Sequence, residues 1–328
     1  MRRLGLWALA AVLAWGWPTG TARAEGWLGL PIDCKLGQTC WPRRYVDHDP
    51  GPGQLDYRCG ALTGDDHKGT DIGFGTLAEI QGGVSVIASA AGIVKAARDG
   101  EIDGGHERLT PGRECGNGVL IDHGGEWTTQ YCHLRQGSIV VRPGDQVGAG
   151  QLLGLVGMSG NTNFPHVHLT VRYKNLPVDP FAAAGANPRL CDGGPSIWTA
   201  AAARQMPYSP VDLVAIGVSA AQPNLAGIAA GTYAAKTASA SAGELHVWML
   251  LWNANSGDRA QLTLTGPDGR QLVSNTTMIV ASHRTSFRSA GVKAKGRWPA
   301  GTYRIAATLE RPGRDRIVRQ RADTFVIR

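Results

Sequence analysis

The chain has 328 residues and a formal net charge of +7. Arg2, Arg3 and Arg23 carry three of these charges, and the remaining +4 is not gathered into a run. A mildly basic chain without an aromatic–basic motif argues against nucleic acid as a partner and suits an anionic polymer. The length indicates about two domains, and short β-branched runs between glycine-rich turns predict an all-β fold.

Residues 1–24 have the pattern of a secretory signal peptide. Two arginines precede a short apolar segment, and Ala22-Arg23-Ala24 forms a small-x-small cleavage site. No later segment approaches the ~20 apolar residues that a transmembrane helix needs. We therefore expect an exported, monomeric protein without a transmembrane segment, either periplasmic or extracellular. An uncleaved N-terminal anchor is the alternative, and the short apolar core disfavours it.

Residues 25–60 are a loop-rich lead, since "DHDPGPGQLDYRCG" consists largely of turn-forming residues. Residues 61–181 follow as an antiparallel β-sheet domain, with runs such as "NGVLIDHGGEWTTQYCHL" and "HVHLTVRY". The polar segment "DGEIDGGHERLTPGREC" interrupts these runs and is interpreted as a surface insertion.

Residues 182–210 form a predicted linker whose alanine-rich stretch can make one short helix. From residue 211 to 328 the sequence contains about seven short strands at regular spacing, which is typical of an immunoglobulin-like β-sandwich. No motif in this part indicates a catalytic or metal-binding site. It is either an accessory binding or spacing domain, or a purely stabilising one.

All six cysteines follow the predicted cleavage site, and an even count in an exported chain favours disulfides. Cys34 and Cys40 can close a local loop. Cys115 and Cys132 flank a hairpin, but a turn at Gly124-Gly125 places them diagonally, so a bulge or a shifted turn is needed for them to bond. Cys59 is then left for Cys191. Spacing alone does not choose among the possible connectivities.

The stretch "FPHVHLTV" contains two histidines one residue apart. Strand alternation places His166, His168 and Thr170 on one face, while the residues between them face the core. Both histidines can therefore serve one site. Taken alone, the pattern also fits an exposed strand with two incidental histidines.

A second polar cluster, "DDHKGTDIG", contains His67 and Asp71 on a turn or at the entry of a strand. Zinc accepts imidazole nitrogen and carboxylate oxygen, and catalytic sites use three protein ligands with a fourth position open. His67, Asp71 and one histidine of the pair would make such a set. Asp65 and Asp66 could coordinate instead, although they fit solvated turn residues.

The third cluster is "WTTQYCHL". Regular alternation places Tyr131 and His133 on one face, and Cys132 and Leu134 on the other. His133 is either a structural residue, or a group that orients water or stabilises an oxyanion near a metal.

In their order along the chain, with His67 and Asp71 first, His133 next, and His166 and His168 last, the three clusters resemble the lysostaphin-type (LytM-like) zinc endopeptidases of bacterial cell walls. The resemblance extends over "VRPGDQVGAGQLLGLVGMSGNT" and "LPVDPF", so that it spans about residues 65–181. It implies one Zn²⁺ per chain, held by His67, Asp71 and His168. It further implies that His133 and His166 position or activate water and stabilise the tetrahedral intermediate.

The sequence departs from the family at Cys132, where a small residue is more usual, and in the insertion before Cys115. Both departures could change the shape of the groove, and neither touches the metal set. The leading hypothesis is therefore a secreted zinc metalloendopeptidase that cleaves peptide stems or cross-links of peptidoglycan. The alternatives are a non-catalytic wall-binding or regulatory protein on the same fold, and an extracellular protease of glycine-rich proteins.

Overall fold

The computed structural model describes residues 26–182 and 194–328. The predicted signal peptide and Cys191, and with Cys191 the predicted Cys59–Cys191 bond, lie outside the described residues. Within these two ranges, no helix is both long enough and apolar enough to cross a bilayer.

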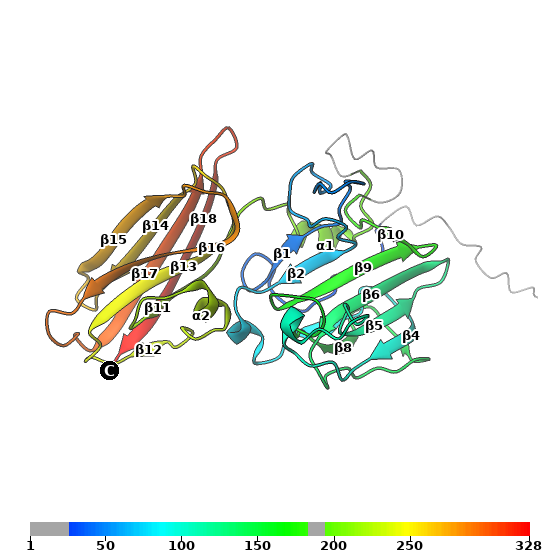
Figure 1. Cartoon of the computed structure of the whole chain (residues 1–328), viewed down its shortest axis with the longest axis horizontal. Coiled ribbons are helices and arrows are strands. Elements are labelled where there is room, and N and C mark those ends of the chain that lie inside the picture. Colours follow the sequence, from blue (N-terminus) through cyan, green and yellow to red (C-terminus); the bar gives the residue numbers. More distant parts are fainter. Residues whose placement is uncertain (1–25, 183–193) are drawn as a thin grey trace, which may run out of the picture.

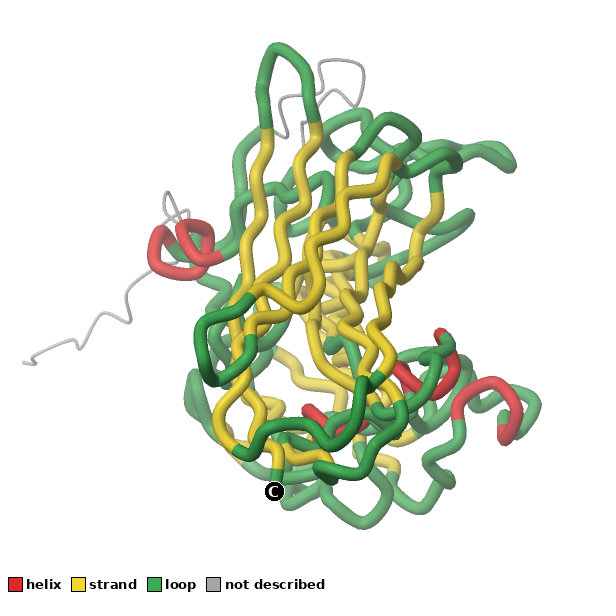
Figure 2. Tube along the Cα trace, turned by 90° about the vertical axis from the view of Figure 1, so that its left-hand side faces the viewer, coloured by secondary structure: helices red, strands yellow, loops and turns green. Residues whose placement is uncertain are grey.

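Two β-rich bodies lie side by side, and the few helices are short and lie outside the sheets (Figures 1 and 2). The first body contains an eight-stranded sheet in the order β1-β2-β9-β6-β5-β4-β7, with β10 paired to β9. All of its strand pairs are antiparallel, as the sequence predicts.

The strands of this sheet are β1 (Trp41–Arg44), β2 (Thr70–Gly73), β4 (Gly92–Arg98), β5 (Asn117–Asp122), β6 (Trp127–Leu134), β7 (Gln146–Val147), β9 (His166–Tyr173) and β10 (Leu176–Val178). A separate two-stranded ladder pairs β3 (Ser85–Ile87) with β8 (Leu152–Leu155). The accompanying helices are the 3₁₀ turns η1 (Leu77–Ile80) and η2 (Gly105–Arg108) and the helix α1 (Ala200–Gln205).

One face of this sheet covers the hydrophobic core. In β9, Val167, Leu169 and Val171 are fully buried in it, as the alternation of the sequence predicts. The segments expected as lead and linker also contribute, since Leu28 and Trp198 pack into the same core. The prediction of a loop-like lead is wrong where β1 forms the edge of the sheet.

The second body is a sandwich of two sheets. Its three-stranded sheet contains β11 (Asp212–Ser219), β13 (Glu244–Ala254) and β16 (His283–Lys293). Its five-stranded sheet contains β12 (Thr237–Ala238), β14 (Arg259–Thr265), β15 (Gln271–Met278), β17 (Gly301–Arg311) and β18 (Ile317–Ile327). The short helix α2 (Leu225–Ala229) lies beside the smaller sheet.

The inner faces of the two sheets bury a shared core, to which β13 contributes Val247, Met249 and Leu251. This confirms the predicted β-sandwich, whereas the specific likeness to immunoglobulin domains and the residue bounds of the domains stay predictions. The alternate residues of β13, including Trp248 and Trp252, form a second apolar cluster outside the sandwich.

That second cluster joins the two bodies. Trp41 of β1 packs edge-on against Trp252, with ring centroids 6.0 Å apart. Arg43 crosses the same boundary, because its guanidinium lies 3.8 Å from the ring centroid of Phe164 and 4.4 Å from that of Trp252. It also donates a hydrogen bond of 2.7 Å to the hydroxyl of Thr285. The sandwich therefore packs directly against the sheet edge that carries β1.

Candidate metal centre

The antiparallel register of β2 and β9 places Asp71 directly opposite His168. Asp71 Oδ1 lies 2.8 Å from His168 Nδ1 and 3.1 Å from His67 Nε2. Gly69 permits this close approach, since a Cβ there would lie 2.6 Å from His168 Nε2 and 2.6 Å from a strand carbonyl. The three predicted ligands thus come together at one point.

The remaining ring nitrogens of the two histidines have their own partners. His67 Nδ1 lies 2.7 Å from the carbonyl oxygen of Tyr45, and His168 Nε2 lies 2.9 Å from the hydroxyl of Thr170. Such outer contacts fix ring orientation and tautomer in metal sites. Two imidazoles and one carboxylate with converging atoms fit the three-ligand arrangement of a catalytic zinc site.

His133 reaches the site through a β-bulge in β6. Between the pairs Asn117–Leu134 and Val119–Tyr131, β6 contains one residue more than β5. His133 occupies the bulge with φ = 65°, a left-handed conformation that is uncommon outside glycine. Its N–H donates to the carbonyl of Cys115 at 2.9 Å, which supports the conformation.

The bulge overturns the predicted arrangement of this strand. Tyr131 is fully buried in the core, as is Leu134, whereas Cys132 and His133 both line the groove. The sequence prediction assumed strict alternation, which an inserted residue breaks. The same bulge brings Cys132 to Cys115, and the disulfide between them confirms this predicted pair. The predicted local bond between Cys34 and Cys40 is also confirmed.

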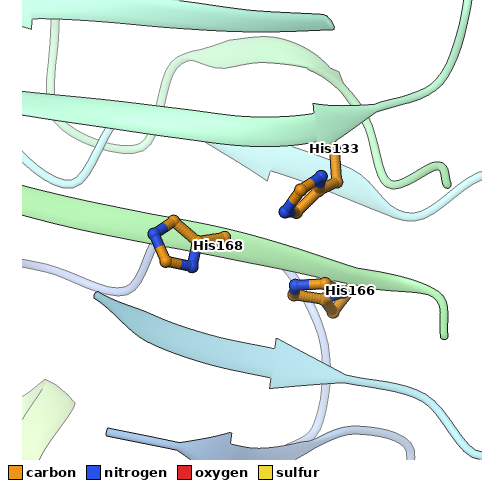
Figure 3. Close-up of side chains that lie close together, drawn as sticks. All are labelled: His133, His166 and His168. Atoms are coloured by element: carbon orange, nitrogen blue, oxygen red, sulfur yellow. The ribbon is translucent and has the colours of Figure 1, made fainter. Parts of the chain in front are cut away.

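His166 and His133 lie next to each other and close to His168 (Figure 3), and Asp71 Oδ1 lies 3.4 Å from His166 Nε2. Their ring centroids are 4.6 Å apart. His166 Nδ1 lies 2.9 Å from the carbonyl of Phe164, and His133 Nδ1 lies 2.8 Å from the carbonyl of Ser159. In each ring Nδ1 can therefore donate to a carbonyl. Nε2 of His166 lies 3.4 Å from Asp71 Oδ1, whereas Nε2 of a neutral His133 is left as a proton acceptor.

Burial and neighbouring charges shift the pKa values of the site residues in different directions. Burial opposes the charge of Asp71, but attraction to His67 and His166 outweighs it and holds the pKa of Asp71 well below its usual value. Burial lowers the pKa of His133 well below its usual value, and also lowers that of His168. Burial disfavours a charge on His67 too, but Asp71 outweighs burial and raises the pKa of His67.

Two groups of described residues have converging atoms that could hold a metal ion, and they share His168. One is His67, Asp71 and His168, and the other is His133, His166 and His168. The first contains the carboxylate, whose negative charge offsets that of a cation. The alternative ligands Asp65 and Asp66 belong to neither group. Both are exposed, and Asp66 pairs with Lys68 at 3.0 Å.

These residues line a groove of about 860 Å³. The predicted insertion contributes to its wall through His106 and Glu114. Sequence reasoning missed Arg44 and Phe164, which also line the groove. Phe164 stacks on His166 with centroids 4.1 Å apart, and its place next to "PHVH" was the available signal. No spacing marks Arg44, which lies far from the other clusters along the chain.

Residues 65–180 match the family model described as Peptidase family M23. This segment belongs to the M23 peptidases. The M23 segment contains all five predicted site residues, and its bounds agree closely with the resemblance found in the sequence.

Two curated relatives match parts of the chain. The cell division protein DipM of Caulobacter vibrioides is 35% identical over 30% of this chain and 16% of its own length. The peptidoglycan DD-endopeptidase ShyA of Vibrio cholerae is 38% identical over 21% of this chain and 15% of its own. The chain thus spans about a sixth of the length of these relatives.

Among solved structures, a mutant catalytic domain of the prophage-encoded M23 protein EnpA from Enterococcus faecalis is 25% identical. The match covers 48% of this chain and 96% of the EnpA domain, with a TM-score of 0.31.

Proposed function

We propose that this protein is an exported, zinc-dependent endopeptidase that hydrolyses peptide bonds in the stems or cross-links of peptidoglycan. The observation that carries the proposal is the convergence of His67 Nε2, Asp71 Oδ1 and His168 Nδ1 within an M23 segment, beside His133 and His166. The named activity of the relative ShyA supports peptidoglycan as the substrate.

The donor set supports zinc as the metal. Imidazole and carboxylate ligands in a three-residue set favour Zn²⁺, which acts as a Lewis acid toward a scissile carbonyl and lowers the pKa of water. We assign His67, Asp71 and His168 to hold it. The second group of potential ligands lacks a carboxylate, so we assign His133 and His166 to proton transfer.

In this assignment, the hydrogen bonds of Nδ1 fix the orientation of both rings, and Nε2 of His166 lies 3.4 Å from Asp71 Oδ1. Nε2 of one ring can accept a proton from water, and a protonated Nε2 can donate to the leaving amine or to an oxyanion. Neutral His133 is suited to the accepting role, because burial disfavours its charged form.

The test uses the purified full chain and purified peptidoglycan, with mass analysis of the released fragments. We expect one zinc ion per chain, peptide-bond cleavage, and loss of cleavage with a chelator. His168→Ala should lose zinc and more than ~100-fold in rate, since even outer contacts of metal ligands are worth ~10–100-fold. His133→Ala should keep zinc and lose ~10²–10⁴-fold.

The exposed His283, on β16 of the sandwich, supplies a matched control, and His283→Ala should keep both zinc and activity. Full lytic activity in His168→Ala, or digestion that resists the chelator, would refute the proposal. Binding of peptidoglycan without cleavage would instead identify a non-catalytic wall-binding protein. Cleavage of a glycine-rich protein but not of peptidoglycan would identify an extracellular protease of glycine-rich proteins.

A further inference from the structure

Three arginines gather where the sandwich meets the groove. Arg43 and Arg44 end β1, and Arg284 lies at the start of β16. Burial lowers the pKa of Arg43, the like charges of Arg44 and Arg284 lower it further, and the negative charge of Asp71 partly opposes this shift. Burial also lowers the pKa of Arg284, with a further contribution from Arg44. The three cations are therefore close enough to repel one another.

Two of the three guanidinium groups are committed to neutral partners. Arg43 lies between two aromatic rings and donates to Thr285. Arg284 donates to the carbonyl of Thr63 and to the side chain of Gln54. Within the described ranges, no carboxylate forms an ion pair with any of the three arginines. Asp71 offsets part of the positive charge of the cluster from a distance, but no carboxylate among the described residues neutralises it by direct contact.

Arg44 differs from the other two because its side chain faces the groove. The register of β1 and β2 places it directly opposite Asp71, which is itself opposite His168. Its guanidinium lies 5.7 Å from the ring centroid of Phe164 and, among described residues, makes no hydrogen bond or ion pair. Asp71 Oδ1 is already surrounded by three imidazoles, at 2.8 to 3.4 Å.

We propose that Arg44 binds a carboxylate of the peptide substrate, and that Arg43 and Arg284 strengthen this site through their charges. A planar guanidinium with free N–H groups matches a carboxylate in a two-point hydrogen bond. This inference rests on the proposed function, and it adds that the enzyme selects acidic peptides.

The position of Arg44 also predicts where the carboxylate lies. Neighbouring strands are about 4.8 Å apart, and an extended peptide advances about 3.3 Å per residue. Arg44 is one strand away from Asp71, the proposed metal ligand on β2. The recognised carboxylate therefore belongs to a residue about one or two positions from the scissile bond.

The test compares cross-linked peptides isolated from peptidoglycan with the same peptides after their carboxyl groups are converted to carboxamides. Cleavage rates give kcat/KM for the acid peptide and for the amide peptide, and the first divided by the second is the preference for the acid. Calorimetry on chelator-treated protein gives the ratio of binding constants independently of turnover. We expect the wild type to favour the acid by about ten- to hundredfold, the range of a hydrogen bond to a charged group.

Arg44→Met should bring both ratios close to one, and Arg44→Lys should restore part of the preference. Arg172 supplies the matched control, because it also lines the groove but already donates to Gln130 at 2.8 Å. Arg172→Met should keep the preference. Because each ratio is measured within one variant, partial misfolding of that variant does not alter it.

Equal binding of acid and amide by the wild type, or a preference that survives Arg44→Met, would overturn the inference. Equal losses in Arg44→Met and Arg172→Met would overturn it as well. If the acid is bound preferentially but nothing is cleaved, the carboxylate site stands and the proposed function fails. If the peptides are cleaved but acid and amide forms react equally, the proposed function stands and the carboxylate site fails.

Discussion

The disulfide between Cys115 and Cys132 should support catalysis as well as stability, because Cys132 precedes His133 in the bulge. The perturbation is the double substitution Cys115→Ser with Cys132→Ser. The two cysteines are 17 residues apart, so loss of the cross-link should lower the free energy of unfolding by about 3 kcal/mol. Without the cross-link, the left-handed conformation of His133 depends on hydrogen bonds alone.

The second bond, Cys34–Cys40, is a matched control. It closes a loop of only six residues, so its removal should cost about 2 kcal/mol. Neither cysteine lines the groove. We therefore expect similar destabilisation from both double substitutions, but a fall in kcat only after loss of the bond at the bulge. Misplacement of a catalytic group by about 1 Å costs up to ~100-fold, so a fall of about 10- to 100-fold is expected.

Urea unfolding measures the stability of each variant, and peptidoglycan digestion is then followed at a temperature at which all variants are folded. Unchanged kcat after loss of Cys115–Cys132 would refute the link between the bond and His133. Equal losses of kcat from both double substitutions would show that stability alone explains the effect.

Two further predictions concern packing and pH. Trp252→Ala should lower the free energy of unfolding by about 3–5 kcal/mol, because Trp252 is 2% exposed, and Trp252→Phe should cost clearly less. A loss below ~1 kcal/mol in urea unfolding would contradict the packing of Trp252 between the two bodies. His48 Nε2 lies 2.8 Å from Asp179 Oδ2, and this hydrogen bond raises the pKa of His48 above 6.5 in the folded protein. The His48–Asp179 contact therefore stabilises the folded protein fully below pH 6.5, and this stabilisation disappears as the pH rises through the raised pKa of His48. His48→Ala should cost about 1–2 kcal/mol at the lower pH and progressively less above it, and an equal cost at both pH values would exclude the ion pair as its source.

Much of the site could be predicted because its residues follow regular rules. His166 and His168 line one groove, as the alternation of strand residues predicts. The orientation of Tyr131 and His133 escaped prediction because a bulge leaves no mark on the pattern of polar and apolar residues. The diagonal placement of Cys115 and Cys132 did indicate that either a bulge or a shifted turn was needed for them to bond.

The strand β1 was missed for a different reason. Pro42 lacks an N–H group and disfavours a strand, but β1 lies at the edge of the sheet, where proline is tolerated. The partners of its residues are also remote in sequence, since Arg43 bonds to Thr285 and Trp41 packs on Trp252. Local patterns contain no information about such pairings.

The place of Arg43 between Phe164 and Trp252 limits how far this protein can be treated as modular. A shortened chain that ends before residue 211 would keep His67, Asp71 and His168, the proposed metal ligands. It would, however, expose Trp41 to water and leave Arg43 with one aromatic neighbour instead of two. Phe164 stacks on His166, so the altered boundary is one side chain away from the site. A replacement C-terminal domain would need an aromatic ring and a hydroxyl where Trp252 and Thr285 now lie, so substitutions at this boundary in one domain restrict those in the other.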